Sequence, residues 1–250
     1  MHVNPVALPL RVMNRTTFTL SAIVAAILLS YGLREALQVA PTEATMGNIQ
    51  RIFYYHVPSN AVAFTMFAVN LLASIFYLVK RNTSHAAAAD AVAVSAAELG
   101  VIFCSVGLVT GMFWAKPVWG IWWTWDARLT STFVLWLIYV SYLMLRRLSA
   151  GDQAPTLAAA QAIFGFVDVP IVYMSIRWWR TQHPQPVIFG EPGQSGLDPA
   201  MTTALLINLA AFMCYGALVF WVRYKLERAR QQLHEAQALH SLELARAEAS

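Results

Sequence analysis

Long apolar runs separated by short polar stretches make up most of this chain. Six runs cover residues 18–38, 60–79, 91–112, 129–145, 157–176 and 200–222. Each is close to the roughly 20 apolar residues that a helix needs to cross the hydrocarbon core of a bilayer. Among open structures, only a helix satisfies its own backbone hydrogen bonds in lipid. The pattern therefore predicts an all-α membrane protein, a bundle of six transmembrane helices that forms one domain over residues 1–222.

The pattern changes after Trp221. Residues 223–250 alternate charged side chains with alanine and leucine. Good helix formers with opposite charges three or four residues apart favour a solvated helix. We expect this segment to be a charged tail that extends the last span and forms a separate unit.

The composition agrees with a membrane protein and argues against a nucleic-acid-binding one. Of the 250 residues, 58% are hydrophobic and only 12% are charged, whereas soluble domains carry about 25% charged residues. The net charge is +4, but the basic residues lie in pairs beside apolar runs, as residues that orient a membrane protein do. We expect a lipid bilayer around the chain and no nucleic acid. Cys104 and Cys214 lie within apolar runs and form no C-x-x-C motif, so covalent c-type haem attachment is not expected.

The distribution of Lys and Arg predicts the orientation. Eleven of the 17 basic residues lie on the side of both termini, and six lie on the other side. Cytoplasmic loops carry the excess of positive charge, so both termini are predicted to be cytoplasmic in a bacterial inner membrane. The connections at 39–59, 113–128 and 177–199 then face the periplasm.

The second outward connection holds a tryptophan-rich segment, Trp-Gly-Ile-Trp-Trp-Thr-Trp-Asp, at residues 119–126. An aromatic belt at the membrane interface explains one or two tryptophans, but four of the nine fall within seven residues. If the segment is helical after Pro117, residues 119, 122, 123 and 126 share one face and Trp125 points away from it. This amphipathic face would be a flat apolar shelf, which suits the face of a porphyrin.

Charged residues near this segment have separate expected roles. Asp126 would repel haem propionates, so its expected role is structural: accepting hydrogen bonds, pairing with Arg128 or favouring the N-terminus of the fourth span. Propionates would instead be met by basic residues on the same side of the membrane. These are Lys116, Arg128, Arg51, Arg177 and Arg180.

His56 and His183 are the only two histidines in the predicted outward connections. An imidazole is a common axial ligand of haem iron, and two of them on opposite faces close the iron site. The alternative for each is a hydrogen-bonded packing residue beside aromatic side chains. Their shared side of the membrane favours a bis-histidine site for haem b.

Residues 119–130 resemble the tryptophan-rich "WWD" signature of haem-handling proteins in cytochrome c biogenesis, within a segment at 114–130. Tyr-His-Val-Pro at 55–58 and Trp-Trp-Arg-Thr-Gln-His at 178–183 resemble the two histidine loops of one such family, haem exporter protein C. The resemblance covers nearly the whole chain. It implies that His56 and His183 are the axial ligands. It also implies a porphyrin platform made of Trp119, Gly120, Trp122, Trp123, Trp125 and Asp126.

The resemblance further implies a function and partners. Members hold haem at the periplasmic face and present it to a membrane-anchored haem chaperone (CcmE-like) for c-type cytochrome maturation. Their complex includes ATP-binding-cassette transporter subunits (CcmA-like and CcmB-like) and a small single-span subunit (CcmD-like). The chain has no Walker A motif, so any ATP hydrolysis is expected in a partner, and we expect a binding and transfer subunit and not an enzyme.

Two other functions compete with this one. An electron-transfer cytochrome b subunit usually holds haem between histidines within its spans, and none of the six predicted runs contains a histidine. In a transport permease, the tryptophans would be only an interfacial anchor. Haem spectra of histidine and tryptophan variants would separate these possibilities.

Two acidic residues lie within apolar runs, Glu98 in the third and Asp168 in the fifth. Acids inside a membrane are costly and usually face the bundle interior. They would serve either a polar pathway or partner contact, or a hydrogen bond to a neighbouring helix. Gly107-x-x-x-Gly111, with Gly100 before it, predicts a face for close helix packing.

Overall fold

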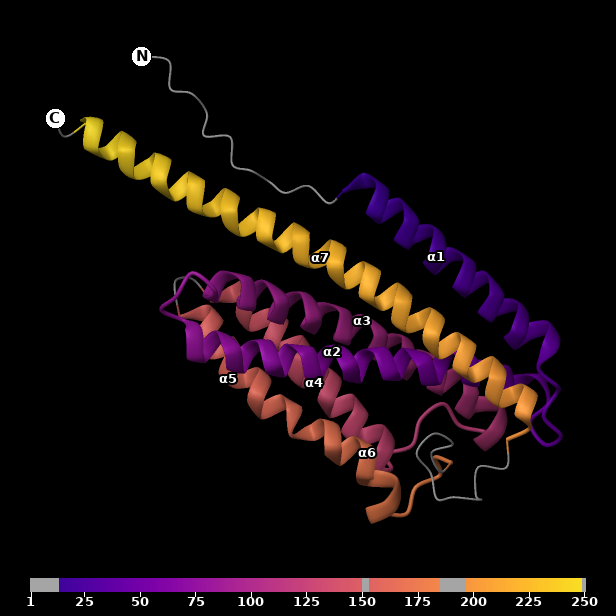
Figure 1. The fold of residues 1–250 in the computed structure, drawn as a ribbon. Coiled ribbons are helices and arrows are strands. Elements are labelled where there is room, and N and C mark those ends of the chain that lie inside the picture. Colours follow the sequence, from indigo (N-terminus) through magenta and orange to yellow (C-terminus); the bar gives the residue numbers. More distant parts are fainter. Residues whose placement is uncertain (1–13, 150–152, 185–196, 249–250) are drawn as a thin grey trace.

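The computed structural model describes residues 14–149, 153–184 and 197–248 and is a bundle of helices (Figure 1). Arg11, which contributes to the predicted charge distribution, and the two ends of the chain lie outside these residues. The helices are α1 (Arg15–Arg34), α2 (Phe53–Lys80), α3 (Ala86–Trp119), α4 (Ala127–Leu148), α5 (Ala154–Phe166), α6 (Asp168–Trp178) and α7 (Pro199–Glu248). A π-helical turn, Glu35–Val39, follows α1, and a 3-10 turn, Asn48–Ile52, precedes α2.

Six helical segments in the described part of the chain are long and apolar enough to cross a membrane, which confirms the predicted six-span architecture. Each of the six predicted runs falls within one of them. The fifth span consists of two helices, since α5 ends at Phe166 and α6 begins at Asp168. Pro170 accounts for the break, because it lacks an N–H and its ring clashes with the carbonyl of residue 166.

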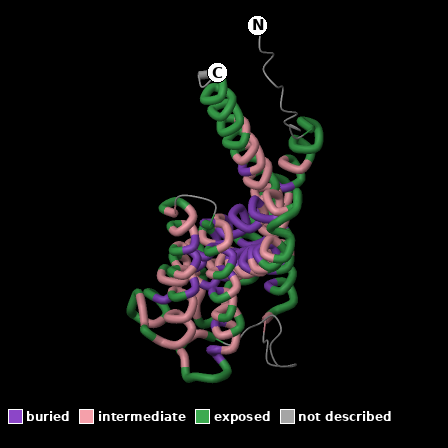
Figure 2. Tube along the Cα trace, turned by 90° about the vertical axis from the view of Figure 1, so that its left-hand side faces the viewer, coloured by how far each residue is buried: buried purple, intermediate pink, exposed green. Residues whose placement is uncertain are grey.

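The antiparallel pair α2 and α3 forms the core of the bundle. Figure 2 shows that buried residues are concentrated in the centre of the bundle. Small residues let the two helices approach closely. A Cβ atom at Gly100 would lie 2.3 Å from the Phe67 ring, and one at Gly107 would lie 2.5 Å from Asn60 Oδ1. The predicted glycine packing face is therefore confirmed. The same Phe67 ring stacks on Tyr139 of α4 with ring centroids 3.8 Å apart.

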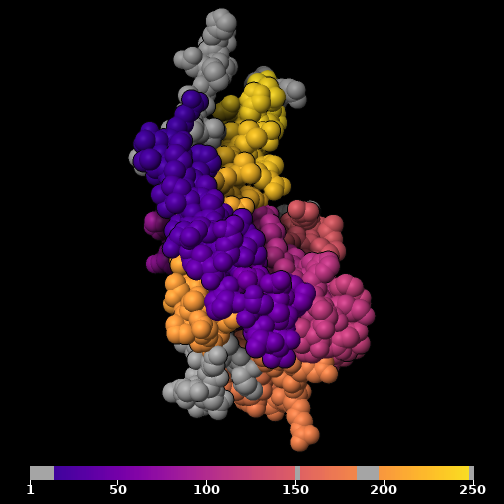
Figure 3. Space-filling model, turned by 90° about the vertical axis from the view of Figure 1, so that its right-hand side faces the viewer, coloured from indigo at the N-terminus to yellow at the C-terminus, as the bar shows by residue number. Residues whose placement is uncertain are grey.

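The last helix, α7, has 50 residues and is therefore about 75 Å long. It runs without a break through residues 222 and 223, where the charged tail was predicted to begin. Its C-terminal part extends beyond the rest of the bundle (Figures 1 and 3). The helix α1 packs mainly against α7, and the Asn208 amide of α7 donates to the Gly32 carbonyl of α1 at 3.0 Å.

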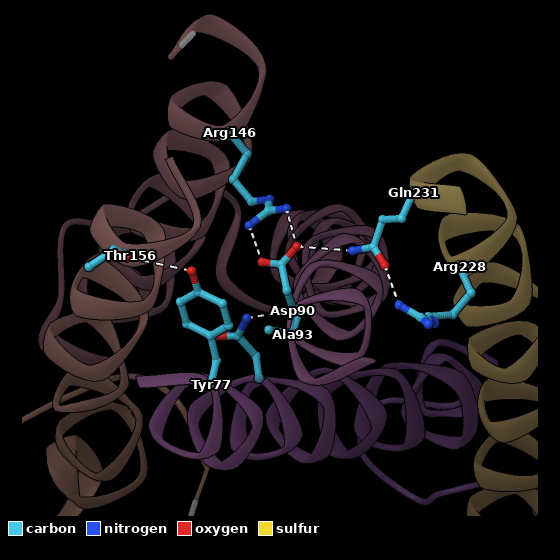
Figure 4. A network of polar contacts seen from close by, with 8 residues as sticks. Tyr77, Asp90, Ala93, Arg146, Thr156, Arg228 and Gln231 are labelled. Carbon is cyan, nitrogen blue, oxygen red and sulfur yellow. Dashed lines mark hydrogen bonds and ion pairs between the residues drawn. The ribbon is translucent and has the colours of Figure 1, made fainter. Parts of the chain in front are cut away.

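A polar network joins α3, α4 and α7 near the end of the bundle from which the α7 tail extends (Figure 4). Asp90 Oδ2 accepts hydrogen bonds from Arg146 Nη2 at 2.8 Å and from Gln231 Nε2 at 3.2 Å. Arg228 in turn donates to Gln231 Oε1 at 2.7 Å. The network therefore fixes the register of α7 against the transmembrane helices.

The two acids predicted within spans have different surroundings. Glu98 forms an ion pair with Arg223, which also pairs with Glu227 at 2.9 Å. The expected bond to a neighbouring helix is thus confirmed for Glu98. Asp168 begins α6, and its buried Oδ2 has no hydrogen-bond partner among the described residues.

Replacing Asp90 by alanine is expected to lower the free energy of unfolding by about 3–5 kcal/mol, because it leaves Arg146 as an unpaired buried charge. The side chains of Asp90 and Arg146 are only 10% and 14% exposed. The double variant Asp90→Leu with Arg146→Leu should recover most of the loss, since no unpaired charge remains. Denaturant unfolding in detergent micelles measures the free energy of unfolding of the wild type, the alanine variant and the double variant. Glu243→Ala, on the exposed tail, is the matched control, and equal stability of Asp90→Ala and the wild type would refute the pairing.

Candidate functional site

A cavity opens among α2, α3, α4 and the segment that follows α6, with about 800 Å³ of space that is partly open to solvent. Its wall is mostly apolar, with phenylalanine, leucine, methionine and tryptophan side chains. The polar and charged side chains in the wall are His56, Asn60, Arg128, Thr132 and His183.

Two histidines face each other across this cavity. The ring centroids of His56 and His183 are 6.5 Å apart, and the ring planes are inclined by 36°. Two imidazoles that bind one iron from opposite sides have ring centres about 6 Å apart, since each metal–nitrogen bond is about 2 Å long and each ring centre lies about 1 Å beyond its nitrogen. Two nitrogens complete an octahedral shell only for a metal that already holds four other ligands, as porphyrin iron does. The separation of the two rings is therefore compatible with two axial ligands of one porphyrin iron.

The position of His56 differs from the sequence prediction. It lies on α2, opposite Gly111 of α3, and not in a loop before the span. Hydropathy placed the helix start too late because it counts polar side chains as exposed to lipid, whereas Tyr54 and Ser59 are buried against the protein. The sequence argument against an electron-transfer cytochrome b subunit was that no span contains a histidine. It therefore does not hold for His56.

The imidazoles are held by hydrogen bonds. His56 Nδ1 lies 3.0 Å from Thr110 Oγ1, and Asn60 Nδ2 lies 2.9 Å from the His56 carbonyl oxygen and 3.4 Å from its Nε2. His183 Nδ1 lies 2.9 Å from the Pro184 carbonyl oxygen. Burial, and then the positive charge of Arg128, lower the pKa of His183 to about 4. His183 is therefore neutral at pH 7, the form in which an imidazole binds a metal.

The tryptophan segment is not a helix, so the prediction of four side chains on one helical face is wrong. The helix α3 ends at Trp119, and residues 120–126 have no regular structure before α4. Gly120 terminates α3 with a left-handed backbone (φ 77°), a conformation that glycine adopts without steric cost. The Lys116 ammonium donates to the Gly120 carbonyl at 2.9 Å and stabilises this end.

The loop divides the tryptophans into two groups. Trp119 and Trp123 line the cavity, whereas Trp122 and Trp125 are 50% and 75% exposed. Trp123 Nε1 is buried without a hydrogen-bond partner in the part of the chain that the structure describes. This donor is available to a polar group of a bound ligand. Trp122 instead packs edge-on against Phe113, with ring centroids 5.7 Å apart.

Asp126 has the structural role expected for it at the start of the fourth span. As the N-cap of α4, it accepts hydrogen bonds from the Leu129 backbone N–H at 2.9 Å and from the Thr124 hydroxyl at 3.1 Å. Substitution of such a cap by alanine costs about 0.5–2 kcal/mol. Asp126 is not among the cavity-lining residues, so its contribution to the site is to orient the start of α4.

Of the five basic residues predicted to meet propionates, the cavity wall includes Arg128. Its guanidinium donates to the Val172 carbonyl of α6, and it forms no ion pair with a described carboxylate. Arg51 is not brought to the cavity, because it donates to Ala36 and Thr42 in the connection after α1. Lys116, Arg177 and Arg180 also lie outside the lining.

Several residues in the cavity wall or in contact with it were not singled out by sequence reasoning. Asn60 follows His56 by one helical turn, so its contact could have been expected from the spacing. Thr110 lies 54 residues from His56, and no local pattern relates them. Met46 and Phe64 also line the cavity. They are ordinary apolar residues, and nothing in the sequence around them indicates a binding site.

Comparison with known proteins gives consistent matches. The protein-family model described as "Heme exporter protein C" matches residues 3–239. Heme exporter protein C of Bradyrhizobium diazoefficiens is 32% identical over 220 residues, 88% of this chain and 81% of the relative. Heme exporter protein C of Escherichia coli K12 is 33% identical over 210 residues, 82% and 80% of the two chains. A putative cytochrome c biosynthesis ccmC-like mitochondrial protein of Arabidopsis thaliana is 32% identical over 191 residues, 76% and 70% of the two.

Proposed function

The chain belongs to the heme exporter protein C family, and on that premise we propose that it binds haem b between His56 and His183 and presents it to a haem chaperone. The family implies haem handling in cytochrome c biogenesis. The observation that carries the finer proposal is the pair of imidazoles 6.5 Å apart in one cavity.

Each part of the cavity suits a different part of haem. The two imidazoles would bind the iron from opposite faces, and Trp119 and Trp123 would cover the porphyrin with apolar surface. The Trp123 N–H and the Arg128 guanidinium would meet polar groups at the rim. Haem supplies the iron and its four equatorial nitrogens, and the protein supplies ligation, orientation and exclusion of water.

The proposed site faces the periplasm of a bacterial inner membrane, with both termini cytoplasmic. The charge distribution supports this orientation. The charged and exposed end of α7 leaves the bundle beyond the Asp90 network, and the cavity lies at the other end of α7, where Met201 and Ala204 pack beside Tyr54. A site on the outer surface can be reached by a membrane-anchored acceptor. The exposed rings of Trp125, Trp178 and Trp179 offer that acceptor an apolar contact surface.

Within this proposal the chain is a binding and transfer subunit and not an enzyme. Any ATP hydrolysis belongs to ATP-binding-cassette subunits of the same complex, because the sequence has no Walker A motif. A single-span subunit would complete the assembly. The reaction at the haem vinyl group would then depend on the acceptor protein, and this chain would contribute the position of the porphyrin.

A matched pair of tryptophan variants tests the proposal. Trp123→Leu removes a ring from the cavity wall and Trp125→Leu removes an exposed one. Because ring stacking contributes about 0.5–1.5 kcal/mol beyond burial, Trp123→Leu should weaken haem binding about 2–10-fold. Trp125→Leu should retain wild-type affinity but slow haem transfer to the acceptor. Titration of haem into the protein in lipid nanodiscs measures the affinity, and subsequent addition of the purified acceptor measures the rate of haem transfer.

Two outcomes would speak against this function. If the wild-type protein does not bind haem in a six-coordinate, low-spin form, the proposed ligation is wrong. If bound haem undergoes reversible reduction and never leaves for the acceptor, an electron-transfer subunit becomes the better interpretation.

A further inference from the structure

Thr110 lies on α3 beside His56 of α2. Its Oγ1 is 3.0 Å from His56 Nδ1. The glycines at 107 and 111 flank it, and a Cβ atom at Gly111 would already lie 3.2 Å from His56 Cε1. The missing side chain at Gly111 thus lets the imidazole approach α3 until it reaches the threonine hydroxyl, and Gly107 makes room for Asn60 in the same way.

The hydroxyl of Thr110 has one proton, which it donates in a hydrogen bond to the helix backbone. Thr110 Oγ1 lies 2.7 Å from the Val106 carbonyl oxygen and 3.1 Å from that of Gly107. A carbonyl oxygen can only accept, so the hydroxyl donates to the backbone, as threonine commonly does within helices. Its lone pairs are then left for His56, and the Nδ1 atom must carry the proton.

The other ring nitrogen of His56 gives the same answer independently. The Asn60 amide nitrogen donates to the His56 carbonyl at 2.9 Å, which fixes the orientation of the amide. This –NH₂ group lies 3.4 Å from His56 Nε2. A donor facing a protonated Nε2 would be unfavourable, whereas a donor facing its lone pair is compatible, and a bound iron would replace this long contact.

His183 has the same arrangement with a different partner. Its Nδ1 lies 2.9 Å from the Pro184 carbonyl oxygen, which can only accept. Both imidazoles therefore carry the proton on Nδ1 and keep the lone pair on Nε2. An imidazole binds a metal through its unprotonated nitrogen, and the hydrogen bond at the other nitrogen decides which one that is.

We propose that Thr110 is a positioning residue that holds His56 in the Nδ1–H tautomer and so presents Nε2 to the iron. The tautomer itself is a property of the haem-free chain, whereas its use in ligation rests on the proposed function. Because the bond raises the basicity of the ligand, Thr110 also favours ferric over ferrous haem.

The tautomer can be tested without haem. In protein labelled with ¹⁵N in the histidine rings, solid-state NMR distinguishes Nδ1–H from Nε2–H, and His56→Ala identifies the signals of His56. The wild type should show only the Nδ1–H form for His56. Thr110→Val keeps the side-chain shape but cannot accept a hydrogen bond, so the Nε2–H form should appear. Thr110→Ser restores the acceptor and should restore the single form.

Haem titration and spectroelectrochemistry test the consequence. Thr110→Val should weaken haem binding about 10–100-fold, as loss of a ligand's hydrogen-bond partner does at other metal sites, and should raise the midpoint potential. Thr110→Ser should behave as the wild type. Thr65→Val is the matched control, because Thr65 makes the same hydroxyl bond within α2, at 2.8 Å to Ala61, outside the cavity lining.

The outcomes separate this inference from the proposed function. An Nε2–H signal for His56 in the wild type, or an unchanged affinity and potential in Thr110→Val, overturns the role of Thr110 while bis-histidine binding stands. A wild-type protein that shows the Nδ1–H tautomer but binds no haem overturns the proposed function instead. A shift of equal size in Thr65→Val would mean that the effect comes from helix stability, which also overturns the role.

Discussion

Haem added to the His183→Ala variant is expected to bind without the six-coordinate, low-spin spectrum of the wild type, and His56→Ala should behave in the same way. In the proposed site each imidazole supplies one of the two axial ligands of the iron. Removing either would leave the iron five-coordinate or bound to water. The loss of affinity should exceed the roughly 10–100-fold that follows from loss of an outer hydrogen-bond partner.

His85→Ala is the matched control for this experiment. His85 is exposed in the turn between α2 and α3, far along the helices from the cavity, so its removal should leave the spectrum and the affinity unchanged. Optical and electron paramagnetic resonance spectra of the purified proteins in nanodiscs distinguish the coordination states. Retention of a low-spin spectrum in both histidine variants would remove the pair from the site.

Arg128→Leu is the second substitution with a large expected effect. Arg128 is the cation in the cavity wall, and no described carboxylate pairs with it. Hydrogen bonds to a charged group contribute about 1.5–3 kcal/mol, so loss of the guanidinium should weaken haem binding roughly 10–100-fold. Arg128→Lys keeps the charge without the planar fork and should lose less.

Haem dimethyl ester makes this experiment specific for the propionates. The ester has no propionate charge, so the wild type and Arg128→Leu should bind it with similar affinity. Arg180→Leu, an exposed arginine outside the lining, should affect neither ligand. If Arg128→Leu weakens the ester and haem equally, Arg128 acts through its bond to the Val172 carbonyl and not on the propionates.

The error in the tryptophan segment shows where pattern reasoning loses its basis. Helical spacing would place residues 119, 122, 123 and 126 on one face, but the left-handed backbone of Gly120 ends α3 before the second tryptophan. Periodicity assumes one continuous element. A glycine that terminates a helix and an aspartate that begins the next one are both short-range signals, and together they indicated a break that the spacing argument did not consider.

Much of the architecture followed from the sequence by itself. The six spans follow from run length, because lipid requires long apolar helices and tolerates no unpaired backbone. The sequence likewise indicated that two histidines and a tryptophan cluster lie toward the same side of the membrane, although it placed His56 in a connection and not on α2. These properties depend only on which residues lie near one another along the chain.

Only the tertiary structure decided which of these side chains meet. It brought Thr110 to His56 and Arg128 to the cavity, and it turned Trp122 and Trp125 away from it. It also assigned Arg51 to the connection after α1 and paired Glu98 with Arg223, 125 residues later in the chain. Such contacts depend on the register and rotation of helices packed side by side. The packing of small residues such as Gly107 and Gly111 sets both, and no spacing within a single helix encodes them.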